Sequence, residues 1–282
     1  MKKYAIVTDS TTYFTKEQFE EFGIKSASLN IIKGEETFKE NDVDNPFVHK
    51  LLKDGFRLTT SQPAPGEYLD IYEELLKEGY EKIFVMVISE KLSGTYQSAK
   101  LAINMLDNPE KVHLFNSNMA AFGNEMLILR LMEFIDQGLS FEDIVSSVEN
   151  LFPSTGLFFS IENLTAIMRS GRLSKAKALV GSVLKVKPII QMVDGKLDLY
   201  KAARTHKKVL AAMLQDMQKK IMDYKQLYVR VCSFNSPEAA ADLKQSIEET
   251  FKDIKITYSD YIGPVFNVHL GEKGYGLSWM FE

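Results

Sequence analysis

The fold class of this 282-residue chain is decided by the segment KIFVMVISEKLSGTYQSA, residues 82–99. Its residues 83–88 form an unbroken apolar run, which indicates a strand buried on both faces, as in a parallel sheet. A pattern typical of a helix then begins at Ser93-Gly94-Thr95 and continues to residue 106. A buried strand followed directly by a helix is the repeating unit of an α/β fold.

The same alternation extends over the first half of the chain. Further strands are predicted at residues 4–8 and 112–115, and further helices at 16–22, 46–53, 67–77, 120–136 and 141–150. The pair Lys33-Gly34 lies between two short strand patterns and predicts a hairpin. We therefore expect an N-terminal α/β domain over residues 1–155, with three layers in which helices cover both faces of a parallel sheet.

The second half has a different rhythm. Asp194-Gly195 is the strongest hairpin signal in the chain, between strands predicted at 188–193 and 196–202. Ser236-Pro237-Glu238 is typical of a helix N-terminus. The other expected elements are helices at 162–169, 175–184 and 205–222, and strands at 156–161, 227–232, 254–258 and 275–281. This mixture predicts a smaller C-terminal α+β domain over residues 156–282.

The composition and several missing motifs exclude whole classes of protein. The longest apolar runs are far shorter than the roughly 20 residues of a membrane helix, and the polar pair Thr8-Asp9 comes too early for a signal peptide. The single cysteine, Cys232, and four widely spaced histidines argue against disulfides and metal sites. The chain also lacks the glycine-rich nucleotide motifs and the hydrolase nucleophile elbow. We expect a cytoplasmic, metal-free protein without a nucleotide cofactor.

The charge is distributed unevenly along the chain. Residues 1–90 carry 17 acids and 11 bases, whereas residues 169–208 carry 11 bases and two acids, a net charge of +9. A solvated surface explains such a run, and so does a surface that faces an anionic ligand or an acidic partner. Nucleic acid is excluded as that partner because Tyr200 is the only aromatic residue among these bases.

Hydroxyl-bearing segments fall at the ends of the predicted strands. They are residues 8–11, 59–63, 89–96 and 116–118. Each alone is a common helix cap, but the carboxyl ends of parallel strands meet at one sheet edge, where ligands bind. The hydroxyls and free backbone N–H groups at Ser93-Gly94-Thr95 suit a small anion such as a carboxylate.

A glycine- and proline-bearing segment near the C-terminus contains the lone histidine His269. Such a histidine is commonly structural. If His269 met Ser93, however, the pair would suit an autonomous serine hydrolase or acyl transferase, although the sequence identifies no third, orienting group. This alternative stays open beside a binding role.

The motifs together resemble those of the DegV family, in particular the FakB-type fatty-acid-binding subunit of a bacterial fatty acid kinase. The resemblance covers nearly the whole chain. Its motifs are Thr8-Asp9-Ser10, Thr60-Ser61-Gln62-Pro63, Ser93-Gly94-Thr95-Tyr96-Gln97-Ser98-Ala99, Ser170-Gly171-Arg172-Leu173-Ser174, Lys187-Pro188-Ile189, Arg204-Thr205, and Gly263-Pro264-Val265 with His269.

The resemblance implies a DegV-like two-domain protein that binds a long-chain fatty acid as its only ligand and catalyses no reaction itself. A separate ATP-dependent kinase would phosphorylate the carboxylate, and the carrier would deliver the acyl phosphate for phospholipid synthesis, with transient contact at a membrane surface. By motif match, Thr60, Ser93 and His269 would bind the carboxylate. Residues near the head group or facing the partner would be Ser61, Gly94, Thr95, Arg172 and Arg204.

Several positions depart from the family pattern. Asn116-Ser117 replaces an aspartate-serine pair, Ser170 replaces the first of two glycines, and His206 stands where a base is common. The bulky Phe266 precedes His269 where smaller residues are usual. These departures bear on ligand preference more than on the fold.

Overall fold

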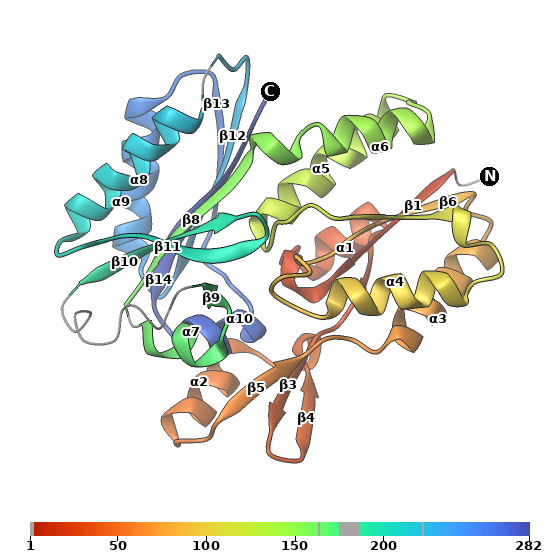
Figure 1. Ribbon diagram of the computed structural model, residues 1–282, viewed down its shortest axis with the longest axis horizontal. Helices are drawn as coiled ribbons and strands as arrows, with labels where there is room; N and C mark the ends of the chain where they lie inside the picture. The colour runs from red at the N-terminus through yellow and green to blue at the C-terminus, as the bar shows by residue number, and fades with distance from the viewer. Residues whose placement is uncertain (1–2, 163, 175–185, 222) are drawn as a thin grey trace. The chain divides into compact units, whose positions relative to one another are not determined.

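The computed structural model describes residues 3–162, 164–174, 186–221 and 223–282. The chain forms two compact units, Met1–Asn150 and Leu151–Glu282 (Figure 1). Each unit has its own sheets and helices and is described by itself.

The first unit contains a four-stranded parallel sheet. Its strands, in spatial order, are β2 (Lys25–Ala27), β1 (Tyr4–Asp9), β6 (Lys82–Met86) and β7 (Val112–Phe115). The apolar run of β6 occupies a central position, where both faces of a strand are buried. The predicted parallel-sheet α/β fold is confirmed.

Helices cover both faces of this sheet. On one face, Val7 and Val85 pack with Tyr68 and Tyr72 of α3 (Pro65–Lys77) and with Ala99 of α4 (Thr95–Met105). On the other face, the ring of Phe84 stacks on that of Phe141 of α6, 4.8 Å between centroids. The helices of this unit are α1 (Lys16–Phe22), α2 (Asn45–Lys53), α3 (Pro65–Lys77), α4 (Thr95–Met105), α5 (Phe122–Asp136) and α6 (Phe141–Glu149), with 3-10 turns at Ser10–Thr12, Glu40–Asp42 and Pro109–Lys111.

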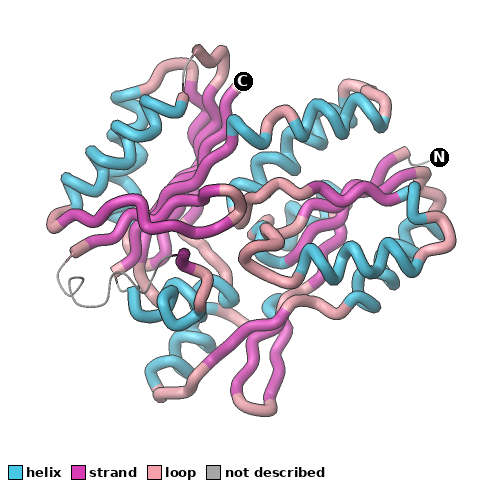
Figure 2. Tube along the Cα trace, viewed as in Figure 1, coloured by secondary structure: helices cyan, strands magenta, loops and turns pink. Residues whose placement is uncertain are grey.

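A small antiparallel sheet is formed by strands that come between β2 and β6 in the sequence. It consists of β3 (Asn30–Lys33), β4 (Glu36–Lys39) and β5 (Leu58–Ser61), with β3 in the middle (Figure 2). The predicted hairpin at Lys33-Gly34 is present, and Gly34 has a φ of 61° that suits the turn. The hydroxyl-bearing segment 59–63 was expected at the carboxyl end of a strand of the parallel sheet, which is wrong, because residues 59–61 lie inside the antiparallel strand β5. This strand carries Thr60 and Ser61 opposite Ile31 and Asn30 of β3.

The second unit is built on a mixed seven-stranded sheet. Its strand order is β13-β12-β14-β8-β10-β11-β9. The bounds are β8 (Thr155–Ile161), β9 (Leu173–Ser174), β10 (Lys187–Val193), β11 (Lys196–Ala203), β12 (Leu227–Phe234), β13 (Ile254–Ser259) and β14 (Gly274–Phe281). The hairpin at Asp194-Gly195 is confirmed, and both turn residues have positive φ, 47° and 77°.

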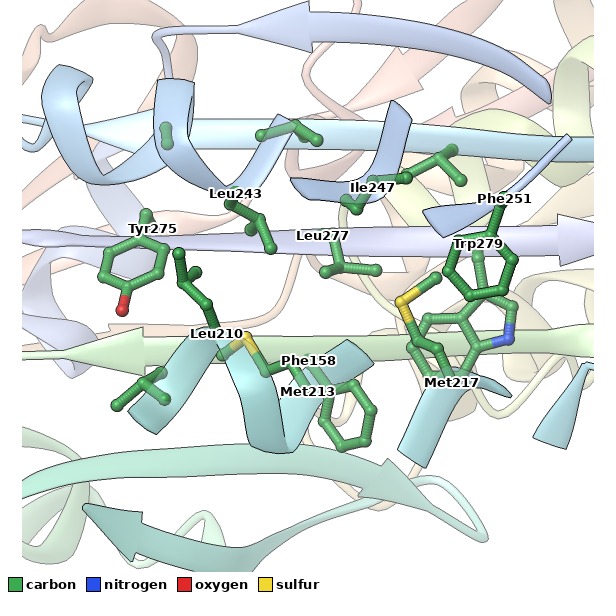
Figure 3. Packing of buried hydrophobic residues seen from close by; sticks show 14 of the residues in the cluster. Phe158, Leu210, Met213, Met217, Leu243, Ile247, Phe251, Tyr275, Leu277 and Trp279 are labelled. Atoms are coloured by element: carbon green, nitrogen blue, oxygen red, sulfur yellow. The ribbon is translucent and has the colours of Figure 1, made fainter. Parts of the chain in front are cut away.

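Two helices, α8 (His206–Lys220) and α9 (Pro237–Thr250), pack on this sheet and form the core of the unit. Met213 and Met217 of α8, Leu243 and Ile247 of α9 and Leu277 of β14 belong to one buried cluster, and Figure 3 shows Met217 beside Phe251 and Trp279. Ser236 occupies the predicted N-cap position of α9, but its side chain makes no capping hydrogen bond.

Two short helices complete the second unit. They are α7 (Leu164–Ser170) and α10 (Pro264–Leu270), which contact each other, and a 3-10 turn lies at Phe152–Ser154. The helix α10 was not predicted, because seven residues between Gly263 and Gly271 are too few to show a helical period. The helix predicted at 175–184 lies outside the described residues.

Candidate functional site

Asp9 connects the ends of two central strands in the first unit. Its carboxylate accepts hydrogen bonds from the Thr11 N–H (2.8 Å), the Thr11 hydroxyl (2.5 Å) and the Ile88 N–H (2.7 Å). Burial raises the pKa of Asp9, and the three hydrogen bonds oppose that shift. Since the carboxylate oxygens are already bonded within the chain, Asp9 shapes the sheet edge.

Ser93, Gly94 and Thr95 form a polar turn at the start of α4. The hydroxyls of Ser93 and Thr95 lie 2.8 Å apart, and the Thr95 N–H donates to Ser93 Oγ at 3.4 Å. Either hydroxyl can be the donor, so the pair can offer one O–H outward and remain hydrogen-bonded internally. Thr95 is fully buried, whereas Ser93 is half-buried and therefore more accessible to a ligand.

The structure brings this turn against the segment that follows β5. A Cβ built on Gly94 would lie 2.9 Å from Cδ of Gln62, so the amide of Gln62 packs directly on the glycine. Asn30 donates from Nδ2 to Ser61 Oγ at 3.2 Å and to the Gln62 carbonyl at 3.4 Å, which fixes the course of that segment. Two of the predicted hydroxyl-bearing segments are thus neighbours, with Thr60 half-buried in β5.

The segment at residues 116–118 has a structural role instead. Ser117 donates its hydroxyl to Asn124 Oδ1 at 2.7 Å, and Asn124 donates to the carbonyls of Val87 (3.0 Å) and Met119 (3.3 Å). Ala121, at the N-cap of α5, has a φ of 50° and a ψ of −128°. Asn124 was not among the predicted site residues, because a polar residue inside a helical pattern gives no signal of a buried hydrogen bond to a distant segment.

In the second unit, Arg172 follows α7 and is held by Ser170. The guanidinium donates to the Ser170 carbonyl at 2.6 Å, and the Arg172 N–H donates to Ser170 Oγ at 3.3 Å. Gly171, with a φ of 74°, makes the turn between them. The serine that departs from the family pattern therefore supports the arginine.

His269 lies on α10, close enough to Arg172 to be affected by its charge. Burial, followed by the positive charge of Arg172, lowers the pKa of His269 to about 4. His269 is therefore a neutral imidazole at pH 7, with one nitrogen as a donor and the other as an acceptor. Such a ring can donate a hydrogen bond to a carboxylate.

Arg204 lies in the turn between β11 and α8 and is exposed. Its basic neighbours Lys201, Lys207 and Lys208 are exposed as well. Of the basic residues that produce the +9 segment, Lys175, Lys177 and Lys185 lie outside the described residues.

The described residues contain neither a cluster of metal-ligating side chains nor a helix that could span a membrane. Over residues 3–162, 164–174, 186–221 and 223–282, no three His, Cys, Asp or Glu side chains are grouped as metal ligands would be. Nor does any helix in those ranges combine the length and apolar character that crossing a bilayer requires.

The sequence comparison matches almost the whole chain to a single family model, that of the uncharacterised DegV family proteins, over residues 3–282. The chain belongs to the DegV family. A DegV domain-containing protein of Halalkalibacterium halodurans is 32% identical over 284 residues, 100% of each chain. Protein DegV of Bacillus subtilis is 32% identical over 281 residues, 99% of each chain.

Solved structures of DegV family members have the same fold. A fatty-acid-binding DegV family protein from Thermus thermophilus matches with a TM-score of 0.93 and 26% identity, covering 99% of this chain and 100% of that one. A stearic acid-binding protein from Eubacterium ventriosum matches with a TM-score of 0.88 and 26% identity, over 99% and 98% of the two chains. Bacillus subtilis DegV, described as a fatty acid binding protein, matches with a TM-score of 0.84 and 30% identity over 100% of both.

Proposed function

We propose that this DegV family chain binds a long-chain fatty acid and acts as a carrier, not as an enzyme. The observation that carries the proposal is the Ser93–Thr95 hydroxyl pair, 2.8 Å apart at the start of α4, in a chain whose structural relatives bind fatty acids. Hydroxyl donors suit a carboxylate, and they leave the main part of the affinity to the acyl chain.

The energetics of such a ligand favour a modest head-group site. Burial of about 0.8 kcal/mol per methylene gives roughly 12 kcal/mol for a sixteen-carbon chain before the cost of association. Few strong polar contacts are therefore required. We assign Thr60, Ser93 and His269 to the carboxylate, and Ser61, Gly94, Thr95 and Arg172 to its surroundings.

We further propose that the carrier works in the cytoplasm and presents the carboxylate to a separate ATP-dependent fatty acid kinase, then carries the acyl phosphate. The exposed bases Lys201, Arg204, Lys207 and Lys208 support this, because they would attract an acidic face of the kinase. Such steering acts mainly on the association rate and weakens with salt. The double variant Lys207→Glu/Lys208→Glu should slow acyl phosphate formation at low salt and leave fatty acid content unchanged.

Ligand binding is tested by solvent extraction of the purified protein and mass spectrometry of the extract. We expect about one fatty acid per chain in the wild type, and less in Ser93→Ala and His269→Gln. Ser146→Ala is the matched control, because Ser146 is exposed on α6 and its hydroxyl bonds only the local Asp143 carbonyl. A wild-type protein that carries no lipid and takes up none from added oleate or palmitate would refute the proposal.

The alternative, a serine hydrolase that uses Ser93 and His269, has less support. A general base works best with a pKa near the operating pH, whereas the pKa of His269 is lowered to about 4. Ester turnover by the isolated protein that disappears in Ser93→Ala would favour the hydrolase.

A further inference from the structure

A cavity of about 280 Å³ lies in the second unit, where α8 and α9 begin. Its walls come from the end of β8, the start of β14, Lys187 of β10 and the first turns of the two helices. Figure 3 shows Tyr275 at one end of the core cluster and Trp279 at the other, and Tyr275 is the member of the cluster that lines the cavity. None of the residues assigned to the fatty acid carboxylate lines it.

The floor of the cavity is a chain of hydrogen-bonding side chains. The Tyr275 hydroxyl lies 2.8 Å from His206 Nδ1 and is also hydrogen-bonded to Ser160. His206 Nε2 lies 3.2 Å from a carboxylate oxygen of Asp242. Burial raises the pKa of Tyr275 to about 12, so its hydroxyl stays protonated and acts as a donor or acceptor, not as a nucleophile.

The rim of the cavity carries charges of both signs. Lys187 and Lys273 come from the strand side, together with Glu162, and Glu238 and Asp242 come from α9. Within the described part of the chain, the side chains of Lys187, Lys273, Glu162 and Glu238 make no ion pair with one another or with another residue. The strand side therefore has an excess of one positive charge, and the α9 side is negative.

The opposite charges on the two sides of the rim determine which class of ligand fits the cavity. A simple anion would face the three carboxylates of the rim, and a simple cation would face the two lysines. A small molecule that carries both charges can satisfy both sides. At roughly 30 Å³ per water the cavity holds about nine waters, which corresponds to a ligand of about nine non-hydrogen atoms.

We propose that this cavity binds a small zwitterion of the amino acid or dipeptide class, with its carboxylate at Lys187 and Lys273 and its ammonium group at Glu238 and Asp242. His206 and Tyr275 provide the polar floor beneath the ligand. This site is independent of the proposed fatty acid site, since it uses other residues.

The full chain is titrated separately with each of the twenty amino acids and with glycylglycine. Binding is monitored by the backbone amide chemical shifts of residues 236–242, apart from Pro237, and of residues 272–275. N-acetylglycylglycine and glycylglycine amide each lack one of the two charges and serve as ligand controls. We expect at least one zwitterion to shift these amides with saturation, and both analogues of glycylglycine to bind at least tenfold more weakly than glycylglycine itself. Absence of saturable shifts with all 21 probes, or equal binding of the three glycylglycine forms, overturns the proposal.

Substitutions of two rim residues test whether the zwitterion binds in this cavity. Glu238→Gln and Lys273→Gln change exposed rim charges without altering His206, Tyr275 or Ser160, and each should weaken zwitterion binding about tenfold. Lys244→Gln, on α9 but outside the cavity, is the matched control and should bind as the wild type does. Fatty acid content, measured by extraction, should be the same in all three, so failure of one proposal is distinguishable from failure of the other. Unchanged zwitterion binding in both rim variants would rule out this cavity.

Discussion

The protonation of His269 provides the sharpest test of the electrostatics of the second unit. The ordinary pKa of a histidine is 6.5, and burial together with the charge of Arg172 lowers that of His269 to about 4. Between these two values the unfolded chain binds a proton that the folded chain does not. The free energy of unfolding therefore rises with pH across this window. The contribution is fully present above pH 6.5 and is lost as the pH falls towards 4.

The magnitude follows from the shift. At 1.36 kcal/mol per pH unit, a displacement from 6.5 to about 4 corresponds to roughly 3 kcal/mol of stability at neutral pH. His269→Gln keeps a polar side chain but cannot titrate. We expect the wild type to lose about 3 kcal/mol more than this variant between pH 7 and pH 4, because all other groups titrate in both proteins.

The assay is urea unfolding of both proteins at several pH values, with the His269 ring titrated by NMR. Arg172→Gln removes the second cause of the shift and should raise the pKa of His269 while leaving it below 6.5, whereas Arg172→Lys keeps the charge and should change it little. A ring titration midpoint near 6.5, or parallel pH profiles for wild type and His269→Gln, would show that the imidazole is not desolvated and would refute the reasoning.

Three further predictions concern packing and hydrogen bonds. Gly94→Ala would place a methyl group 2.9 Å from Cδ of Gln62, whose flexible amide can move. We therefore expect the free energy of unfolding, measured by urea titration, to change by less than about 1 kcal/mol. The fatty acid content, measured by mass spectrometry, should be lower than in the wild type. Asn124→Ala removes the hydrogen bonds of Asn124 to the carbonyls of Val87 and Met119 and to the hydroxyl of Ser117. It should lower the free energy of unfolding, measured by urea titration, by about 3 kcal/mol. An unchanged unfolding midpoint would contradict these hydrogen bonds. Gly156→Ala would put its Cβ 2.0 Å from a ring atom of Trp279, so we expect a loss of about 3 kcal/mol and a shifted emission of this single tryptophan; a native spectrum with unchanged stability would contradict the close packing.

Local patterns were sufficient for most of the elements. The apolar run of β6 indicated a central parallel strand, and Asp194-Gly195 indicated the hairpin of β10 and β11, because a buried strand and a type of turn each need particular residues in sequence. The bounds and pairing of β5 were missed because its sequence, Leu58–Ser61, has a single apolar residue, and α10 was missed because seven residues are too few for a helical period to be recognised.

The candidate site could be predicted only in part. Strand ends with hydroxyls pointed to the segments that contain Thr60 and Ser93, and the glycine- and proline-bearing C-terminal segment pointed to His269. Matching of motifs gave these residues a carboxylate-binding role and added Arg172. The sequence could not separate ligand-facing hydroxyls from structural ones. Ser117 has the same chemistry as Ser93, yet its hydroxyl is used by Asn124 inside the first unit.

The sequence by itself determined the α/β class, the family and the residue types available for an anionic head group, because these depend on periodicity and on local order along the chain. Only the tertiary structure decided which polar groups are already hydrogen-bonded, that Gln62 packs on Gly94, and that the imidazole of His269 is neutral at pH 7. It also decided that His206, Tyr275 and Asp242 share the wall of one cavity. The physical reason is that solvation and pairing depend on neighbours distant in sequence, which the packing of strands and helices brings together.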